Sequence, residues 1–222
     1  MKRILTVFAL AVLTTTAFAE KGYIITQKFV GISKTDITVS WYVSANRCKM
    51  KMLFGNGSQT STTHFIPDIT NAQLLTYNES PVVEGAQKAY YKIPIDKVSV
   101  SKDATVGRIT VTKTGESKEI GGLNCEKILI KTDKHETEVW VSKKFAPEFY
   151  KYYPFFRDHH ALAGLSEEKL KGFPVESVTR DLSGKTISAY QFVSATETDF
   201  TEADFKVPAD YKSPEEIEGK GK

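Results

Sequence analysis

Cysteine is scarce in this chain, and several features that mark specialised classes of protein are missing. The 222 residues include only two cysteines, Cys48 and Cys125, too few for a disulfide scaffold or a four-thiolate zinc site. Neither sign of charge dominates, because the chain has 30 lysines and arginines and 27 aspartates and glutamates. A dedicated nucleic-acid-binding protein needs a more concentrated positive field. We therefore expect no nucleic-acid partner.

Common catalytic signatures are also missing. The sequence has no G-x-S-x-G elbow, no H-E-x-x-H pair and no phosphate-binding loop. The adjacent His159 and His160 diverge by about 100° on a helix, or point to opposite faces of a strand, so they chelate one ion poorly. We therefore predict no metal ligand, no cofactor and no identifiable catalytic residue.

Long hydrophobic runs are limited to the N-terminus. Two basic residues precede an apolar stretch from 4 to 13, and an A-x-A pattern ends at Ala19. This arrangement is typical of a cleavable signal peptide, which we place at 1–19. The apolar stretch is too short to cross a bilayer core of about 30 Å. No cysteine lies at the cleavage point, so we expect a periplasmic or secreted chain without a lipid anchor or a transmembrane segment.

A period of two dominates from residue 23 onward. Apolar and polar residues alternate over 37–44 and again over 47–54, which predicts strands with one buried face. Antiparallel strands joined by short turns need no crossover helices, so the pattern favours a mainly β fold. Further strands are predicted at 62–66, 72–77, 88–93, 107–113, 123–132, 136–142, 174–182 and 186–196.

The region 146–170 breaks this pattern, because it is rich in aromatic residues at roughly helical spacing. Pro154 should interrupt a continuous helix, whereas Ser166 suits a helix start and Gly172 a helix end. We predict two short helices on either side of an irregular centre. The stretch 78–87 is expected to be a surface loop.

The aromatic region has two interpretations, ordinary core packing or a lid over an apolar hollow in the sheet. For the second interpretation the candidate ligand-binding residues are Trp41, Met50, Met52, Trp140, Phe149 and Phe156. The two cysteines have three interpretations. Cys48 and Cys125 form a disulfide, which an exported protein permits, or they are buried core thiols, or one of them is a nucleophile.

The order of several segments resembles the LolA-like group of exported domains. The chain resembles most a family of secreted bacterial domains of unknown function within that group. The segments are ITVSWYVSANRCKMKML, QKAYYKI, EIGGLNCEKILI, ETEVWVSKKF, LKGFPVESV and FTEADFKVPADYK. The resemblance covers roughly 23–212. It implies a curved antiparallel sheet, an open half-barrel, with short helices packed on its concave face.

These observations lead to one main hypothesis and two alternatives. We expect a single domain over 20–212, followed by a flexible polar tail over 213–222. The domain would bind a hydrophobic small molecule or lipid, such as an acyl chain, on its concave face. The first alternative is an envelope protein that recognises another protein, as in a stress response, through an exposed strand edge. The second is a cofactor-free enzyme that uses Cys125, Asp158 or His160 in a closed pocket.

Overall fold

A computed structural model describes residues 19–31, 36–56, 59–79, 87–95, 109–145, 149–156 and 171–219. These residues form one antiparallel sheet of eleven strands in the order β6-β5-β4-β3-β2-β1-β11-β10-β9-β8-β7. The strands are β1 (Glu20–Gly31), β2 (Asp36–Ser44), β3 (Cys48–Asn56), β4 (Gln59–Asp68), β5 (Gln73–Glu79), β6 (Tyr90–Pro94), β7 (Thr110–Ile120), β8 (Leu123–Lys131), β9 (His135–Ser142), β10 (Phe173–Asp181) and β11 (Thr186–Phe200).

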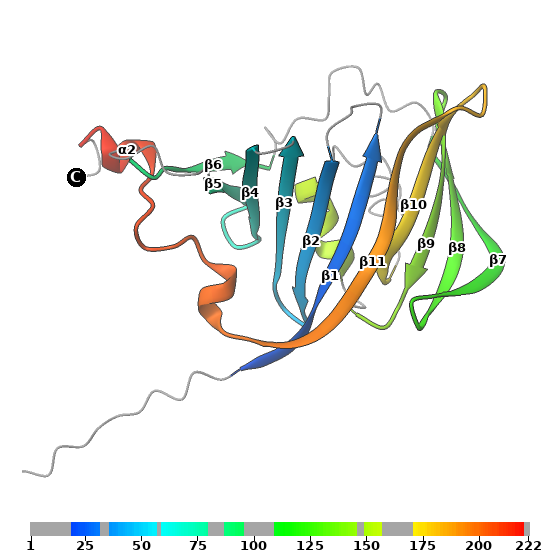
Figure 1. Ribbon diagram of the computed structural model, residues 1–222, viewed down its shortest axis with the longest axis horizontal. Coiled ribbons are helices and arrows are strands. Elements are labelled where there is room, and N and C mark those ends of the chain that lie inside the picture. Colours follow the sequence, from blue (N-terminus) through cyan, green and yellow to red (C-terminus); the bar gives the residue numbers. More distant parts are fainter. Residues whose placement is uncertain are drawn as a thin grey trace, which may run out of the picture.

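The first and last strands pair with each other at the centre of the sheet. Glu20 of β1 lies opposite Phe200 of β11, and the ladder continues to Gly31 opposite Ser188. On each side of this pair, every strand neighbours the next one in sequence, so two meanders join at the middle. The sheet curves but stays open between β6 and β7 (Figure 1). The predicted fold class, an open antiparallel sheet, is confirmed.

Register places one row of apolar side chains across the concave face. Ile25 pairs with Trp41, Trp41 with Met50, and Met50 with Phe65. Directly paired residues of antiparallel strands point to the same side, so these four share a face. The alternation in the sequence therefore predicted the strands correctly because one side of them is buried in a common core.

The aromatic region contributes a 3₁₀ helix, η1 (Phe149–Phe156), which packs against the concave face. Figure 1 shows it behind β1 to β3. The prediction that Pro154 would interrupt the helix was wrong, because Pro154 lies inside η1. With eight residues, η1 is long for a 3₁₀ helix, and Pro154 lies in its second half. The second predicted helix and the His159–His160 pair lie outside the described residues, as do most of the predicted loop 78–87 and 1–18 of the predicted signal peptide.

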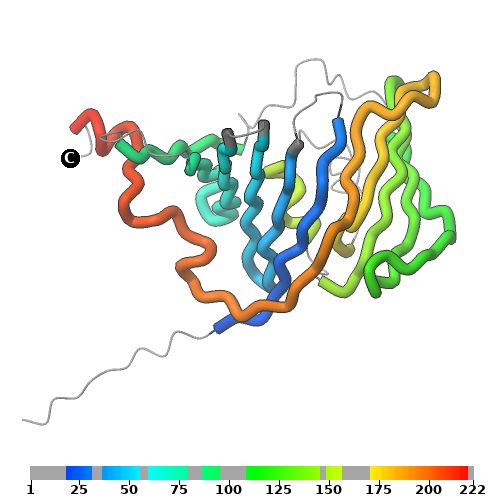
Figure 2. The backbone as a smooth tube through the Cα atoms, in the orientation of Figure 1, coloured from blue at the N-terminus to red at the C-terminus, as the bar shows by residue number. Residues whose placement is uncertain are grey.

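After β11 the chain runs back beside the first meander (Figure 2), where Tyr211 packs with Ile66 and Tyr77 in a small cluster separate from the main core. We call residues 201–217 the C-terminal strap. It contains a short 3₁₀ helix, η2 (Glu202–Phe205), and one helical turn, α2 (Pro214–Ile217), which begins with a Ser213 capping box. A parallel bridge joins Lys212 to Ala89 beside β6. The predicted polar tail, 213–222, thus starts with an ordered turn.

Among the described residues, no helix has the length and apolar character needed to cross a membrane.

Candidate binding site

The concave face has two ends that differ in burial. At the plugged end, under η1, the inward side chains are at most 3% exposed; they are Ile25, Trp41, Val43, Cys48 and Met50. At the open end, further along the same strands, the inward apolar side chains keep part of their surface exposed; they are Phe29, Ile37, Met52 and Tyr190. One continuous apolar surface is therefore sealed at one end and accessible at the other.

Trp41 is the centre of the plugged end. Three phenylalanine rings meet its indole edge-to-face, with centroid distances of 5.5 Å for Phe149, 5.0 Å for Phe156 and 5.8 Å for Phe173. Edge-to-face contacts of this kind add to the free energy gained by burying the rings. Phe149 and Phe156 belong to η1, whereas Phe173 starts β10. Trp41 therefore binds the plug and the second meander to the first.

A buried glutamine supplies the polar connection at the same place. Gln27 is 3% exposed, and its Oε1 accepts a hydrogen bond of 2.9 Å from the Trp41 indole N–H. Its Nε2 donates to the carbonyl oxygens of Pro174 and Val175, at 2.8 and 2.7 Å. Those carbonyls lie at an irregularity in the ladder between β10 and β9, where backbone groups need another partner. Gln27 thus supplies hydrogen bonds to the backbone carbonyls at the place where the β10–β9 ladder is interrupted.

A tyrosine of η1 fastens the plug to the start of β10. Tyr153 is fully buried, and its hydroxyl donates 2.9 Å to the carbonyl oxygen of Gly172. Burial raises the pKa of this phenol, so it stays a donor. Gly172 has a φ of +123°, and a Cβ there would lie 2.8 Å from the Ser142 carbonyl oxygen. Only glycine fits this position without strain.

The structure brings together four of the six predicted ligand-binding residues. Trp41, Met50, Phe149 and Phe156 share the plugged end, where they pack on each other. Met52 lies next to them at the open end. The sequence did not single out Gln27 or Phe173 as partners of Trp41, or Tyr153 as the residue that holds η1 to Gly172, because nothing in their local pattern indicates these contacts.

Trp140 is set apart from this group. It points away from its buried strand neighbours Val139 and Val141 and lies on the same side as Lys127, with which it pairs. The ammonium groups of Lys118 and Lys127 lie 4.4 and 5.9 Å from its ring centroid. These cation–π contacts belong to a charged patch on the other side of the sheet rather than to the Trp41 cluster.

Both cysteines are free and buried in the structure. Five strands separate β3, which carries Cys48, from β8, which carries Cys125. Burial raises the pKa of both thiols, that of Cys125 to about 11. At neutral pH both are therefore thiols rather than nucleophilic thiolates.

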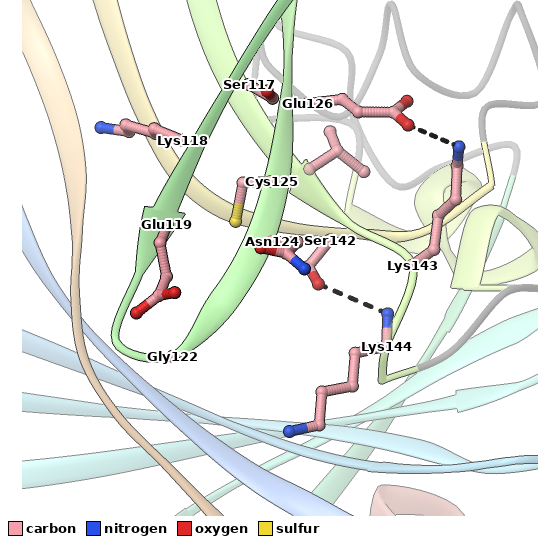
Figure 3. A pocket seen from close by; sticks show the side chains of 11 residues that line it. Ser117, Lys118, Glu119, Gly122, Asn124, Cys125, Glu126, Ser142, Lys143 and Lys144 are labelled. Atoms are coloured by element: carbon pink, nitrogen blue, oxygen red, sulfur yellow. Dashed lines mark hydrogen bonds and ion pairs between the residues drawn. The ribbon is translucent and has the colours of Figure 1, made fainter.

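Two cavities open at the margins of the core, and the second of them reaches Cys48 of the plugged end. The first, of about 690 Å³, lies between the β7–β8 hairpin and the end of β9. Figure 3 shows Cys125 between Lys118 and Glu119 on one side and Lys143 and Lys144 on the other. Glu126 and Lys143 form an ion pair of 2.8 Å at its rim.

The second cavity, of about 470 Å³, lies under the C-terminal strap. Its floor contains Cys48, Ile66 and Leu75, while Phe205 of the strap forms part of its wall. At its mouth, the Glu202 carboxylate and the Lys206 ammonium form an ion pair of 2.7 Å. Within the described ranges, no three histidine, cysteine or acidic residues are placed to hold a metal ion.

Comparison of the sequence with models of known protein families gives one match. The model of the family of domains of unknown function DUF4412 matches residues 29–211, which include ten of the eleven strands completely or nearly so. The chain belongs to this family. The assignment confirms the predicted resemblance to a family of unknown function, and it covers the plug, the open end and most of the strap of this DUF4412 chain.

Several solved structures resemble the DUF4412 chain at low identity. An uncharacterised conserved protein from Thermus thermophilus is 13% identical, with 87% of this chain and 90% of that one covered and a TM-score of 0.47. A chain of the MucA/MucB complex of Pseudomonas aeruginosa is 12% identical, with 87% of this chain and 58% of that one covered and a TM-score of 0.46. A domain described as an outer membrane lipoprotein-sorting protein from Vibrio parahaemolyticus is 9% identical, with 84% of this chain and 89% of that one covered and a TM-score of 0.38. The DUF4412 chain thus spans less than two thirds of the MucA/MucB match. No curated protein matches its sequence.

Proposed function

We propose that this chain is an exported binding module that holds a hydrophobic group, such as an acyl chain, at the open end of its concave face. The observation that carries the proposal is the difference in burial along that face. Phe29, Ile37, Met52 and Tyr190 continue the apolar core, yet each keeps part of its surface exposed. Partly exposed apolar side chains in a concave surface are typical of ligand sites.

The plug supports this function by giving the ligand a fixed floor. The Trp41 cluster is tightly packed and hydrogen-bonded, so the acyl chain would not displace it. The Phe29 and Tyr190 rings, 4.9 Å apart and tilted by 52°, would contact the ligand from neighbouring strands. Binding of this kind needs few polar groups and no cofactor, in keeping with the lining residues.

A matched pair of substitutions tests the proposal. Met52 points to the concave face, whereas its neighbour Leu53 points outward and is 37% exposed. Met52→Lys should weaken binding of a fluorescent fatty acid by about tenfold or more, because a desolvated ammonium costs at least the 1.4 kcal/mol that tenfold represents. Leu53→Lys should leave the affinity unchanged. Titration followed by fluorescence measures both.

Extraction provides a second readout. The natively purified chain should release lipid that mass spectrometry identifies, and Met52→Lys should release less of it than Leu53→Lys. A wild-type protein that is empty after purification and does not bind the fluorescent fatty acid contradicts the proposal.

An alternative function is recognition of another envelope protein through a strand edge. The observation in its favour is that β7, eleven residues long, lies at the end of the sheet. Its register shifts between Lys113 and Ser117, and Gly115 there has a φ of +79°. Such a bulge twists an edge away from further pairing, so we favour the binding of a hydrophobic group. The enzyme alternative gains no support from Cys125, whose raised pKa keeps it protonated.

A further inference from the structure

Aromatic rings in contact hold the C-terminal strap against the first meander. His64 of β4 lies parallel to Tyr77 of β5, with centroids 4.4 Å apart and an interplanar angle of 5°. Tyr77 in turn contacts Tyr211 of the strap at 4.8 Å. The Tyr211 hydroxyl donates 3.2 Å to the carbonyl oxygen of Asn78. The strap is therefore fastened to His64 through a single intervening ring.

Backbone and ionic contacts complete the attachment. The amide N–H of Tyr90 donates to the carbonyl oxygen of Lys212, and the amide N–H of Lys212 donates to that of Lys88, each at 3.0 Å. The Lys88 ammonium lies 2.6 Å from the Asp210 carboxylate. The strap thus occupies the hydrogen-bonding groups at the start of the edge strand β6.

His64 is the weak point of this arrangement. It is 4% exposed, and neither ring nitrogen makes a well-formed hydrogen bond, although Nε2 lies 3.2 Å from a Glu79 carboxylate oxygen. Most buried polar groups in proteins have a partner, and one without a partner marks a strained or switchable position. A protonated ring here would be a buried charge with one poorly aligned partner.

The charges around the ring are mixed. Lys49 and Lys51 of β3 and Glu79 of β5 act on the His64 ring, and Tyr77 of β5 stacks on it. Tyr42 of β2 and two strap residues, Asp204 and Tyr211, lie one step further out, where they act on or contact Glu79, Lys49 and Tyr77. Burial lowers the pKa of His64 most strongly, Glu79 opposes this effect, and the two lysines reinforce it. The clamped state therefore favours the neutral ring.

We propose that the strap is an acid-released clamp, in which protonation of His64 loosens the hold of residues 201–217 on β4 to β6. Released, the ring would reach water and recover the ordinary histidine pKa of about 6.5. Since the clamped ring has the lower pKa, the clamp is fully stabilised above about pH 6.5. It weakens as the pH falls from there toward the pKa of the clamped ring.

Release has two structural consequences. The hydrogen-bonding groups of Lys88 and Tyr90 lose Lys212, which frees the edge of β6 for another strand. The cavity of about 470 Å³ loses a wall, because Glu202, Phe205 and Lys206 belong to the strap. Both sites lie on other surfaces than the open end, so the clamp does not depend on the proposed function.

Amide hydrogen exchange in the full chain tests the clamp. After correction for intrinsic rates, exchange at the Tyr90 and Lys212 amides should speed up between pH 7.5 and 5. The increase should be about tenfold for each unit by which the His64 pKa differs between the two states. His64→Gln should abolish this increase, whereas His135→Gln, on β9 in the other meander, should keep it. An acid response that survives His64→Gln overturns the proposal.

Two charge variants keep the proposal testable if His64→Gln does not fold. Glu79→Gln removes the group that favours the protonated ring, so the same acidification should open the strap further. Lys51→Met removes a repulsive charge, so it should open less. Equal responses of the two variants, or a wild-type strap whose corrected exchange is independent of pH, would refute an electrostatic clamp at His64.

Discussion

The two ends of the concave face are built from the same strands but differ in what their side chains do. At the plugged end, Trp41 and its ring partners are sealed, and each polar group that Gln27 contacts is paired. At the open end, Met52 and its neighbours have the same apolar character but lack a complete cover. The plugged end therefore contributes to the stability of the fold, whereas the open end is where the proposed function places the ligand.

The largest expected effect separates the two tryptophans. Trp41→Ala removes a fully enclosed ring with three aromatic partners, so it should lower the free energy of unfolding by about 3–5 kcal/mol. Trp140→Ala, which removes a partly exposed ring on the other side of the sheet, should cost about 1 kcal/mol. Urea unfolding followed by circular dichroism measures both. Equal losses would show that the Trp41 cluster is no more important for stability than the outer patch.

The next effect concerns the polar groups of the plugged end. Gln27→Leu keeps the approximate volume but leaves the Trp41 N–H and the carbonyls of Pro174 and Val175 without their partner. Each unpaired buried group costs about 1–3 kcal/mol, so a total loss of about 2–4 kcal/mol is expected after relaxation. Gln191→Leu, on the exposed side of β11, is the control and should be nearly neutral. A neutral Gln27→Leu would mean that water replaces the amide.

A smaller effect is expected where the plug meets β10. Gly172→Ala forces a side chain into a positive φ and against Val141 and Ser142, which should cost about 1–3 kcal/mol. Gly184 has a φ of +85° with nothing within 4 Å of a Cβ. Gly184→Ala therefore measures the conformational cost alone, and the difference between the two thermal shifts gives the steric part. A difference near zero would indicate that the end of β9, at Val141 and Ser142, moves aside to accept the methyl group.

Much of the sheet could be predicted from local pattern, and the limits of that pattern have physical causes. Alternation over 37–44 and 47–54 predicted β2 and β3 closely, because each strand has one face in the core. Alternation does not say which buried-looking residues converge, however. Trp41 and Trp140 have similar surroundings in the sequence, yet register places them on opposite sides of the sheet.

The strap and the buried polar groups were harder to predict. Residues 201–217 are mostly charged or polar, so their sequence gives no sign that Tyr211 packs on Tyr77 far earlier in the chain. Gln27 and His64 occupy positions where alternation alone would suggest an apolar residue. Their roles depend on partners from distant strands, and only the three-dimensional register provides those.

The pairing of β1 with β11 has a consequence for how the molecule assembles. Each meander can form from hairpins between sequence neighbours, but the seam between them joins Glu20 to Phe200 and so closes a loop of nearly the whole chain. Loop closure over such separations is slow compared with hairpin formation. A ribosome that still holds β11 thus keeps the two meanders from joining, because the seam between them cannot form until that strand has emerged.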